Sequence, residues 1–163
     1  MGRPLQRFML GVLLILPLTF GVWYLTAAYH LAPVTLLAEK TLHLIVPGAL
    51  QWLKLDGHIL VVASNFGADT TGQILSPPPG PDLLGFHLNP LIYSYSLPLL
   101  LALILATPGQ ERGQKLLWGI LLLLPTEWFS MVFSVMKTLT FDVGAAFPAA
   151  AGFDAALEWM LSP

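Results

Sequence analysis

One acidic residue interrupts the most C-terminal of the long apolar stretches. Glu127 lies about midway between Lys115 and Lys137, and no other Asp, Glu, Lys or Arg occurs between these lysines. An ionised carboxylate at the centre of a bilayer is costly, and such residues commonly take part in function. We expect either a functional carboxylate that faces a polar partner, or a structural one that is protonated, hydrogen-bonded or shallower in the bilayer.

Polar partners for this carboxylate are expected in the segment NPLIYSYS. Its side chains with donors or acceptors are Asn89, Tyr93, Ser94, Tyr95 and Ser96. At 3.6 residues per turn, Asn89, Tyr93 and Ser96 share one helix face, which would bind a partner chain at the membrane surface. The alternative is a capping asparagine followed by an interfacial belt of tyrosines.

Lys137 is the third candidate position, since it ends the apolar stretch that contains Glu127. A site of Glu127, Tyr93 and Lys137 would make the chain an unusual membrane enzyme, but about 15 Å of helix separates Glu127 from Lys137. The alternative is a terminal lysine that extends its side chain toward water. No catalytic constellation is visible, so we predict no catalytic residue.

Histidines are the remaining candidates for chemistry, and none has the close pair spacing of a known metal-ligand motif. The 4 histidines are His30, His43, His58 and His87. His87 precedes NPLIYSYS closely enough to join a partner-binding surface there. We predict neither a metal site nor a bound cofactor.

Composition indicates that lipid is the solvent of this chain. Of its 163 residues, 56% are hydrophobic and 10% are charged, against roughly 45–50% and about 25% in soluble domains. The net charge of −2 provides no basic surface for nucleic acid. The absence of cysteine excludes disulfides, thiolate metal ligands and a cysteine nucleophile. We therefore expect an integral membrane protein in contact with the bilayer.

Stretches free of Asp, Glu, Lys and Arg predict three membrane-spanning helices, at residues 8–28, 90–107 and 116–136. The first would alternatively be a cleaved signal peptide, because arginines precede it and alanines end it. The tail, 138–163, is rich in alanine and predicts an interfacial helix, with a fourth span as the alternative. The expected fold is one all-α membrane domain over residues 1–163.

Residues 30–88 are expected outside the membrane. From Val34 to Leu55 the charge pattern predicts an amphipathic helix at the membrane surface, interrupted at Pro47-Gly48, with a tilted span as the alternative. Residues 57–66 and 84–89 are typical of short strands and predict a β-hairpin-like pair. A loop rich in proline and glycine joins them.

Orientation follows from the positively charged residues near the span ends. Arg3, Arg7, Arg112 and Lys115 fall on one side of the predicted spans, and the positive-inside rule makes that side cytoplasmic. The N-terminus is therefore predicted to be cytoplasmic, and both 30–88 and 138–163 extracytoplasmic.

Two runs of sequence resemble a known family. The runs LLGFHLNPLIYSYSLPLLLALILATPG and QERGQKLLWGILLLLPTEWFSMVFSVMKTL resemble the exosortase H-associated membrane proteins. Exosortases are bacterial inner-membrane enzymes that process proteins with a C-terminal sorting helix, using a Cys, an Arg and a His at the outer ends of membrane helices. The resemblance implies a similar plan: an extended segment, an entering helix, a tight loop and a returning helix.

The residues of the exosortase site are missing from these positions. The region where the enzymes have their cysteine reads NPLIYSYS, and Lys137 is the only cation near the outer end of the returning helix. An amide or a phenol does not replace a thiolate nucleophile. The resemblance therefore implies a non-enzymatic accessory protein of the bacterial inner (cytoplasmic) membrane, which binds the sorting enzyme or its helical substrate.

Small residues of the second and third predicted spans would pack against such a partner helix. They are Ser94, Ser96, Ala102, Gly119, Ser130 and Ser134. A small transporter or channel component is the remaining alternative. It is disfavoured because three spans with one acid make no continuous polar path without oligomers.

Overall fold

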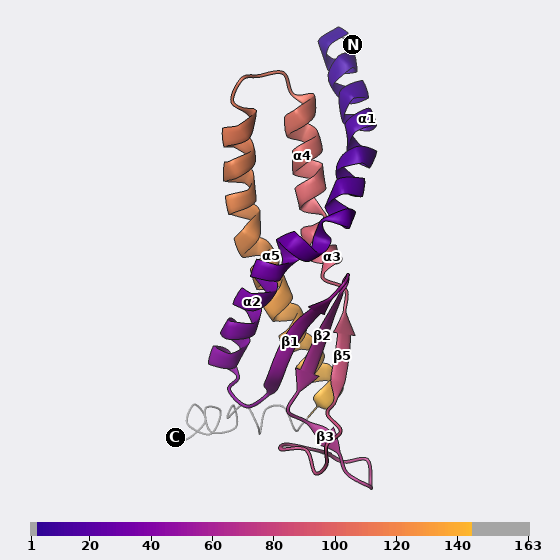
Figure 1. Ribbon diagram of the computed structural model, residues 1–163, viewed down its shortest axis with the longest axis vertical. Coiled ribbons are helices and arrows are strands. Elements are labelled where there is room, and N and C mark those ends of the chain that lie inside the picture. Colours follow the sequence, from indigo (N-terminus) through magenta and orange to yellow (C-terminus); the bar gives the residue numbers. More distant parts are fainter. Residues whose placement is uncertain (1–2, 145–163) are drawn as a thin grey trace, which may run out of the picture.

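A computed structural model, which describes residues 3–144, shows an elongated molecule in which helices join a small antiparallel sheet (Figure 1). Its helices are α1 (Arg3–Leu25), α2 (Ala27–Ile45), α3 (Leu91–Ser94), α4 (Ser96–Ala106) and α5 (Arg112–Val143). At one end α4 lies between α1 and the first half of α5. At the other end, α2 and the sheet surround the second half of α5.

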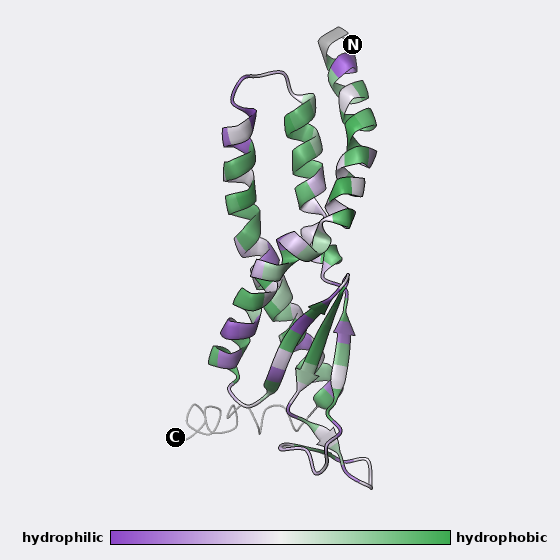
Figure 2. Cartoon of the chain, in the orientation of Figure 1, coloured by the Kyte–Doolittle hydropathy of each residue, from purple (hydrophilic) through white to green (hydrophobic). Residues whose placement is uncertain are grey.

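Among the described residues, two helices are long and apolar enough to cross a membrane, judged by length and composition: Leu5–Leu25 and Arg112–Val143. The segment Leu91–Ala106 is apolar but shorter. Figure 2 shows hydrophobic residues covering α1, α4 and the first half of α5. The chain is thus mostly helical, and the number of spans stays a prediction.

The helices differ from the predicted spans at their ends. The first helix ends at Leu25 rather than at residue 28, and Thr26 separates it from α2. Asn89 caps the entering helix as predicted, since its Oδ1 accepts a hydrogen bond from the Leu91 N–H at 3.1 Å. The returning helix continues beyond residue 136 to Val143, so its 32 residues are about 48 Å long.

Glycine lets α5 approach α4 closely, whereas the contact between α1 and α4 has ordinary spacing. A Cβ atom added to Gly119 of α5 would lie 2.4 Å from Leu100 Cδ2 of α4. On the opposite side of α4, a Cβ atom at Gly11 of α1 would lie 3.6 Å from Ala106 Cβ. Small residues let helix backbones approach where lipid supplies no hydrophobic drive. Gly119 is therefore used inside the molecule and is not available to a partner helix.

The prediction of helix as far as Leu55 is wrong, because α2 ends at Ile45 and residues 50–56 form a strand, β1 (Leu50–Asp56). Pro47 has no N–H to continue a helix, and Gly48 has a φ of 96°. Beyond this turn, residues 53–56 (LKLD) alternate apolar with polar residues, as strands do. The fold consequently contains more sheet than the predicted all-α class allows.

The predicted strand pair is confirmed and forms part of a three-stranded sheet with the order β1-β2-β5. Strand β2 (Ile59–Ser64) pairs antiparallel with β5 (Gly85–Leu88), placing Leu60 opposite Leu88. Within the loop that joins them, β3 (Gly67–Ala68) and β4 (Ile74–Leu75) form a small hairpin. The Asp69 side chain holds its turn through bonds from Thr71 and Gln73, which lower the pKa of that carboxyl.

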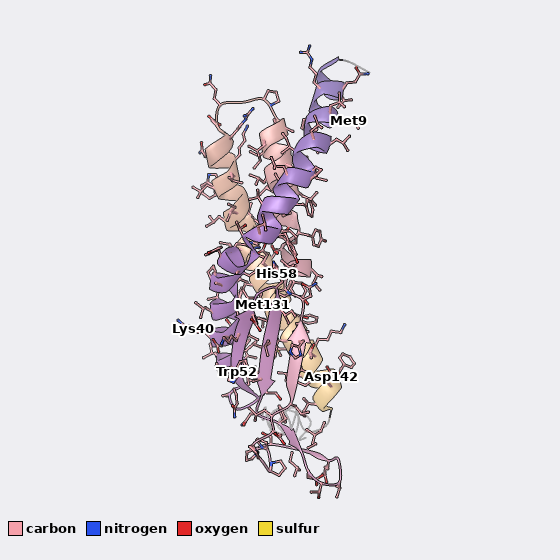
Figure 3. The ribbon with its side chains drawn as sticks, turned by 45° about the vertical axis from the view of Figure 1, so that its right-hand side comes forward. Met9, Lys40, Trp52, His58, Met131 and Asp142 are labelled. Atoms are coloured by element: carbon pink, nitrogen blue, oxygen red, sulfur yellow. The ribbon has the colours of Figure 1, made fainter. Side chains whose placement is uncertain are left out.

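The main core lies between the sheet, α2 and the second half of α5. Fully buried apolar members from these elements include Leu31, Leu42, Leu60, Phe66, Met131 and Leu139. The β1–β2 turn meets the end of α1, where the rings of His58 and Tyr24 stack at 4.2 Å (Figure 3). His58 Nε2 also bonds the Tyr24 carbonyl at 3.0 Å. This contact fixes the sheet against the helical end of the molecule.

The predicted extracytoplasmic tail begins inside a helix, because residues 138–143 belong to α5. The interfacial helix and the alternative fourth span predicted further along, at residues 145–163, lie outside the described residues.

Replacing Gly119 with Val tests the α4–α5 packing. The added side chain overlaps Leu100 unless that side chain or its helix shifts, and overpacking of this kind typically costs about 1–3 kcal/mol. We expect a lower thermal unfolding midpoint in mild detergent. Gly113→Val on the same helix is the control, because nothing lies within 4 Å of a Cβ atom there. Equal midpoints for the two variants would contradict the packing described.

Candidate functional site

Two buried polar side chains lack hydrogen-bond partners within the part of the chain that the structure describes. Glu127 of α5 is 1% exposed, and neither carboxylate oxygen has a partner. Thr35 of α2 is 4% exposed, and its Oγ1 is also without one. The helices α2 and α5 pack together. Buried polar groups are normally satisfied, so these atoms mark a place where an additional group is expected.

Glu127 lies near one end of the α3–α4 helix. Gly119 is opposite Leu100, and Glu127 follows Gly119 by about 12 Å along α5. Helices α3 and α4 run antiparallel to α5, and Ile92 precedes Leu100 by about the same distance. Glu127 is therefore level with the start of the entering helix. This position favours the alternative in which the carboxylate is shallower than the centre of the bilayer.

A separate polar cluster joins three helices beside this position. Trp23 Nε1 of α1 donates to Ser94 Oγ of α3 at 3.2 Å, and His30 Nε2 of α2 lies 3.5 Å from the same oxygen. Ser94 is completely buried. Burial lowers the pKa of His30, and the Thr26 carbonyl, 3.1 Å from its Nδ1, partly opposes that effect. The cluster ties the start of α2 to the entering helix.

Sequence reasoning named Ser94 but missed Trp23 and His30 as its partners. These two residues lie on α1 and α2, and Ser94 is more than sixty residues further along. No local spacing links such distant positions. The aromatic and polar character of the TFGVWYLTAAYH run was the only available signal.

The other predicted site residues are dispersed. The Tyr93 hydroxyl donates to Ser134 Oγ, which joins α3 to α5. Tyr95 is 55% exposed and Ser96 is half-buried. His87 and Lys137 are exposed. None of these residues hydrogen-bonds to the buried carboxylate, so the contacts of the described residues do not assemble a Glu/Tyr/Lys site.

Two grooves open between the helices. The larger, called here the α2–α5 groove, has a volume of about 390 Å³ and an apolar lining. Its lining residues are Pro33, Val34, Leu37, Leu121, Leu124, Pro125 and Trp128. The smaller, of about 200 Å³, lies across α4 between α1 and α5, next to the Trp23–Ser94–His30 cluster. Trp128 Nε1 at the larger groove donates to Thr41 Oγ1 at 3.1 Å.

Residues 3–144 contain no group of three or more His, Asp or Glu side chains that would hold a metal ion. His58 stacks on Tyr24, and His30 belongs to the buried cluster, so these two histidines already have structural contacts.

Comparison with known proteins identifies a family. A family model described as "Exosortase H-associated membrane protein" matches residues 2–160. No curated protein and no solved structure matches the chain.

Removing the unpartnered polar atoms is expected to stabilise the isolated protein. Thr35→Val and Glu127→Met keep the side-chain volume roughly constant, and each unsatisfied buried group costs about 1–3 kcal/mol. We expect a higher thermal unfolding midpoint in detergent for both variants. Thr41→Val is the control on α2 and should lower the midpoint, because Thr41 accepts the Trp128 bond. A lower midpoint for Thr35→Val and Glu127→Met would show that these groups already have partners.

The lowered pKa of His30 predicts that the protein loses stability in mild acid. Its pKa in the folded protein is below 6.5 because of burial, so the unfolded chain binds a proton first. This contribution to stability is fully present above 6.5 and is lost as the pH falls below it. His30→Gln should flatten the decline in unfolding midpoint between about pH 7.5 and 5.5. Parallel curves for wild type and variant would refute this role.

Proposed function

The chain belongs to the exosortase H-associated membrane proteins, and on this premise we propose that it is a non-enzymatic accessory subunit of an exosortase-type sorting system. In this role it binds the sorting enzyme or the helical segment of a sorted substrate. The family match over residues 2–160 is the observation that carries the proposal. It is supported by the sequence, which has no cysteine to act as a nucleophile.

The proposed location is the bacterial inner membrane, with the N-terminus in the cytoplasm and α1, α3–α4 and α5 as spans. The arginines at the start of α1 and the Arg112–Lys115 segment lie at the same end of the molecule, beyond the apolar helices (Figure 2). This arrangement supports the orientation, because positive residues are retained on the cytoplasmic side. The sheet and α2 then lie on the extracytoplasmic side.

The partner surface differs from the one expected from small residues alone. Ser94 and Ser134 are used in bonds between helices, and Gly119 contacts Leu100. Ala102 is completely buried. These positions therefore stabilise the chain itself. The α2–α5 groove is the better candidate for a partner helix, because it is large and apolar and lies where the proposed extracytoplasmic α2 meets the spanning helix α5.

Glu127 lies beside this groove without lining it. It is 1% exposed, whereas its neighbours Leu124, Pro125 and Trp128 line the groove. A partner helix that parts α2 from α5 locally and carries a hydrogen-bond donor would satisfy the carboxylate, which has no partner among the described residues. Such a bond would select among apolar helices, since an apolar helix alone leaves the carboxylate without a partner.

Co-purification tests the proposal. The tagged protein is expressed with its cognate exosortase and with a sorted precursor, and is purified in mild detergent. We expect one of them to be retained, while an unrelated multi-pass membrane protein at the same level is lost. Failure to retain either the enzyme or the precursor, with and without cross-linking, would contradict the proposal.

Two matched variants locate the surface within this experiment. Leu121→Trp fills the α2–α5 groove and should reduce retention of the partner. Leu122→Trp adds the same ring at the adjacent residue, which is 72% exposed and outside the groove lining, and should not. Equal retention by both variants would exclude the groove as the contact.

A further inference from the structure

We propose that the outer edge of β5 is a strand-addition site, at which an extended, membrane-proximal segment of a partner polypeptide pairs with Gly85 and His87. The inference deepens the proposed function and rests on it, and its occupant is the sorted substrate, whose extended segment would lie next to its own membrane helix. The observation behind it is a contrast between the two edges of the sheet. The β1 edge has a bonded partner, whereas the β5 edge has none among the described residues.

The direction of the β5 backbone groups follows from the β1 edge. Leu53 N donates to Glu39 Oε1 of α2 at 3.0 Å, so the Leu53 N–H points away from β2. Residue pairs along an antiparallel ladder alternate between hydrogen-bonded and non-hydrogen-bonded, and Leu53–Val62 is therefore a non-hydrogen-bonded pair. The backbone groups of Val62 then point toward β5, so Val62 and Phe86 form a hydrogen-bonded pair.

The same alternation exposes the neighbours of Phe86. Gly85 and His87 must direct their N–H and C=O groups away from β2. No hydrogen bond to these outward groups occurs within the part of the chain that the structure describes. Both residues are exposed, and a Cβ atom on Gly85 would meet only the Val62 carbonyl, at 3.7 Å. The edge is thus open to another chain.

The β1 edge is closed in the ways that proteins use to prevent edge pairing. The Glu39 carboxylate accepts a hydrogen bond from the Leu53 N–H. Helix α2 packs along the strand, and a register shift lies between Leu50 and Trp52. The β5 edge is short, at four residues, but no described residue bonds its outward groups. A strand edge left open beside a closed one is suited to strand addition, a common mode of peptide recognition.

A second copy of the chain does not fit this edge. The strands run along the same long axis as α1 and α5 (Figure 1). Two β5 strands paired antiparallel are related by an axis perpendicular to that direction, which would invert one copy in the membrane. A twofold axis along the strand direction would make the two β5 strands parallel. It would place each N–H opposite the same N–H of the second copy, so no parallel ladder of hydrogen bonds forms. The occupant is therefore a different polypeptide.

The place of β5 in the chain indicates which part of the partner would bind. β5 is followed by Asn89-Pro90 and then by α3 and α4. A strand beside β5 therefore lies next to the point where the entering helix begins. A polypeptide with an extended segment next to its own membrane helix would align both with this chain. Backbone bonds supply affinity in this mode, and side chains beside the edge supply specificity.

Residue-resolved hydrogen–deuterium exchange tests the edge without any substitution. In the purified protein alone, the amides of Gly85 and His87 should exchange fast and that of Phe86 slowly. In the co-purified complex with the precursor, the first two should become protected, and protection by exosortase without precursor would assign the edge to the enzyme and overturn the proposal. Slow exchange of Gly85 and His87 in the protein alone would show that the tail or a second copy already fills the edge. That result, or unchanged exchange in the complex, would overturn the proposal.

A proline variant tests whether the outward His87 N–H contributes to the affinity for the partner. His87→Pro removes an outward N–H and leaves the β2 ladder intact, as edge prolines do, while His87→Ala keeps the N–H. One lost bond should weaken retention of the partner by about tenfold in the proline variant alone. Circular dichroism and the unfolding midpoint check that both variants fold.

The outcomes separate this inference from the proposed function. Retention of the partner by wild type, with equal loss or no loss in the two variants, would overturn strand addition and leave the accessory role standing. If wild type retains neither exosortase nor precursor, the accessory role fails and strand addition fails with it.

Discussion

The packing of α5 against two different partners is the constraint on which the rest of the structure depends. Its first half contacts α4 at Gly119, where an added Cβ atom would overlap the Leu100 side chain. Its second half presents Met131, Val135 and Leu139 to the core beneath the sheet. One continuous helix of 32 residues thus connects the lipid-facing end and the sheet-bearing end. A change in its tilt would be transmitted to both.

The two ends meet where polar groups are concentrated. The Trp23–Ser94–His30 cluster and the His58–Tyr24 stack tie α1 to α2, to α3 and to the sheet. The Tyr93–Ser134 bond ties α3 to α5. In a bilayer, apolar contacts between helices gain little over contacts with lipid, so such bonds and close packing hold the arrangement. Glu127 lies at the same level, yet its carboxylate has no hydrogen-bond partner among the described residues.

The sequence was sufficient for features that depend on local pattern. Uncharged runs predicted the apolar helices, Asn89 predicted its own cap, and alternation predicted the β2–β5 pair. It failed at β1, because Lys40 and Lys54 suggested one helix although Pro47 and Gly48 separate them. The contacts of the candidate site join residues up to 87 positions apart, as between Trp128 and Thr41. Such contacts depend on tertiary packing and leave no periodic signal.

An unsatisfied carboxylate and an open strand edge are both unfavourable features for a protein that acts alone. Burial of Glu127 and Thr35 without partners lowers the stability of the isolated chain. An exposed edge invites indiscriminate pairing, and the chain closes its other edge with Glu39. A partner that supplies both a donor and an extended backbone would remove both costs together. Both features therefore support the proposed role, in which the chain is one part of an assembly.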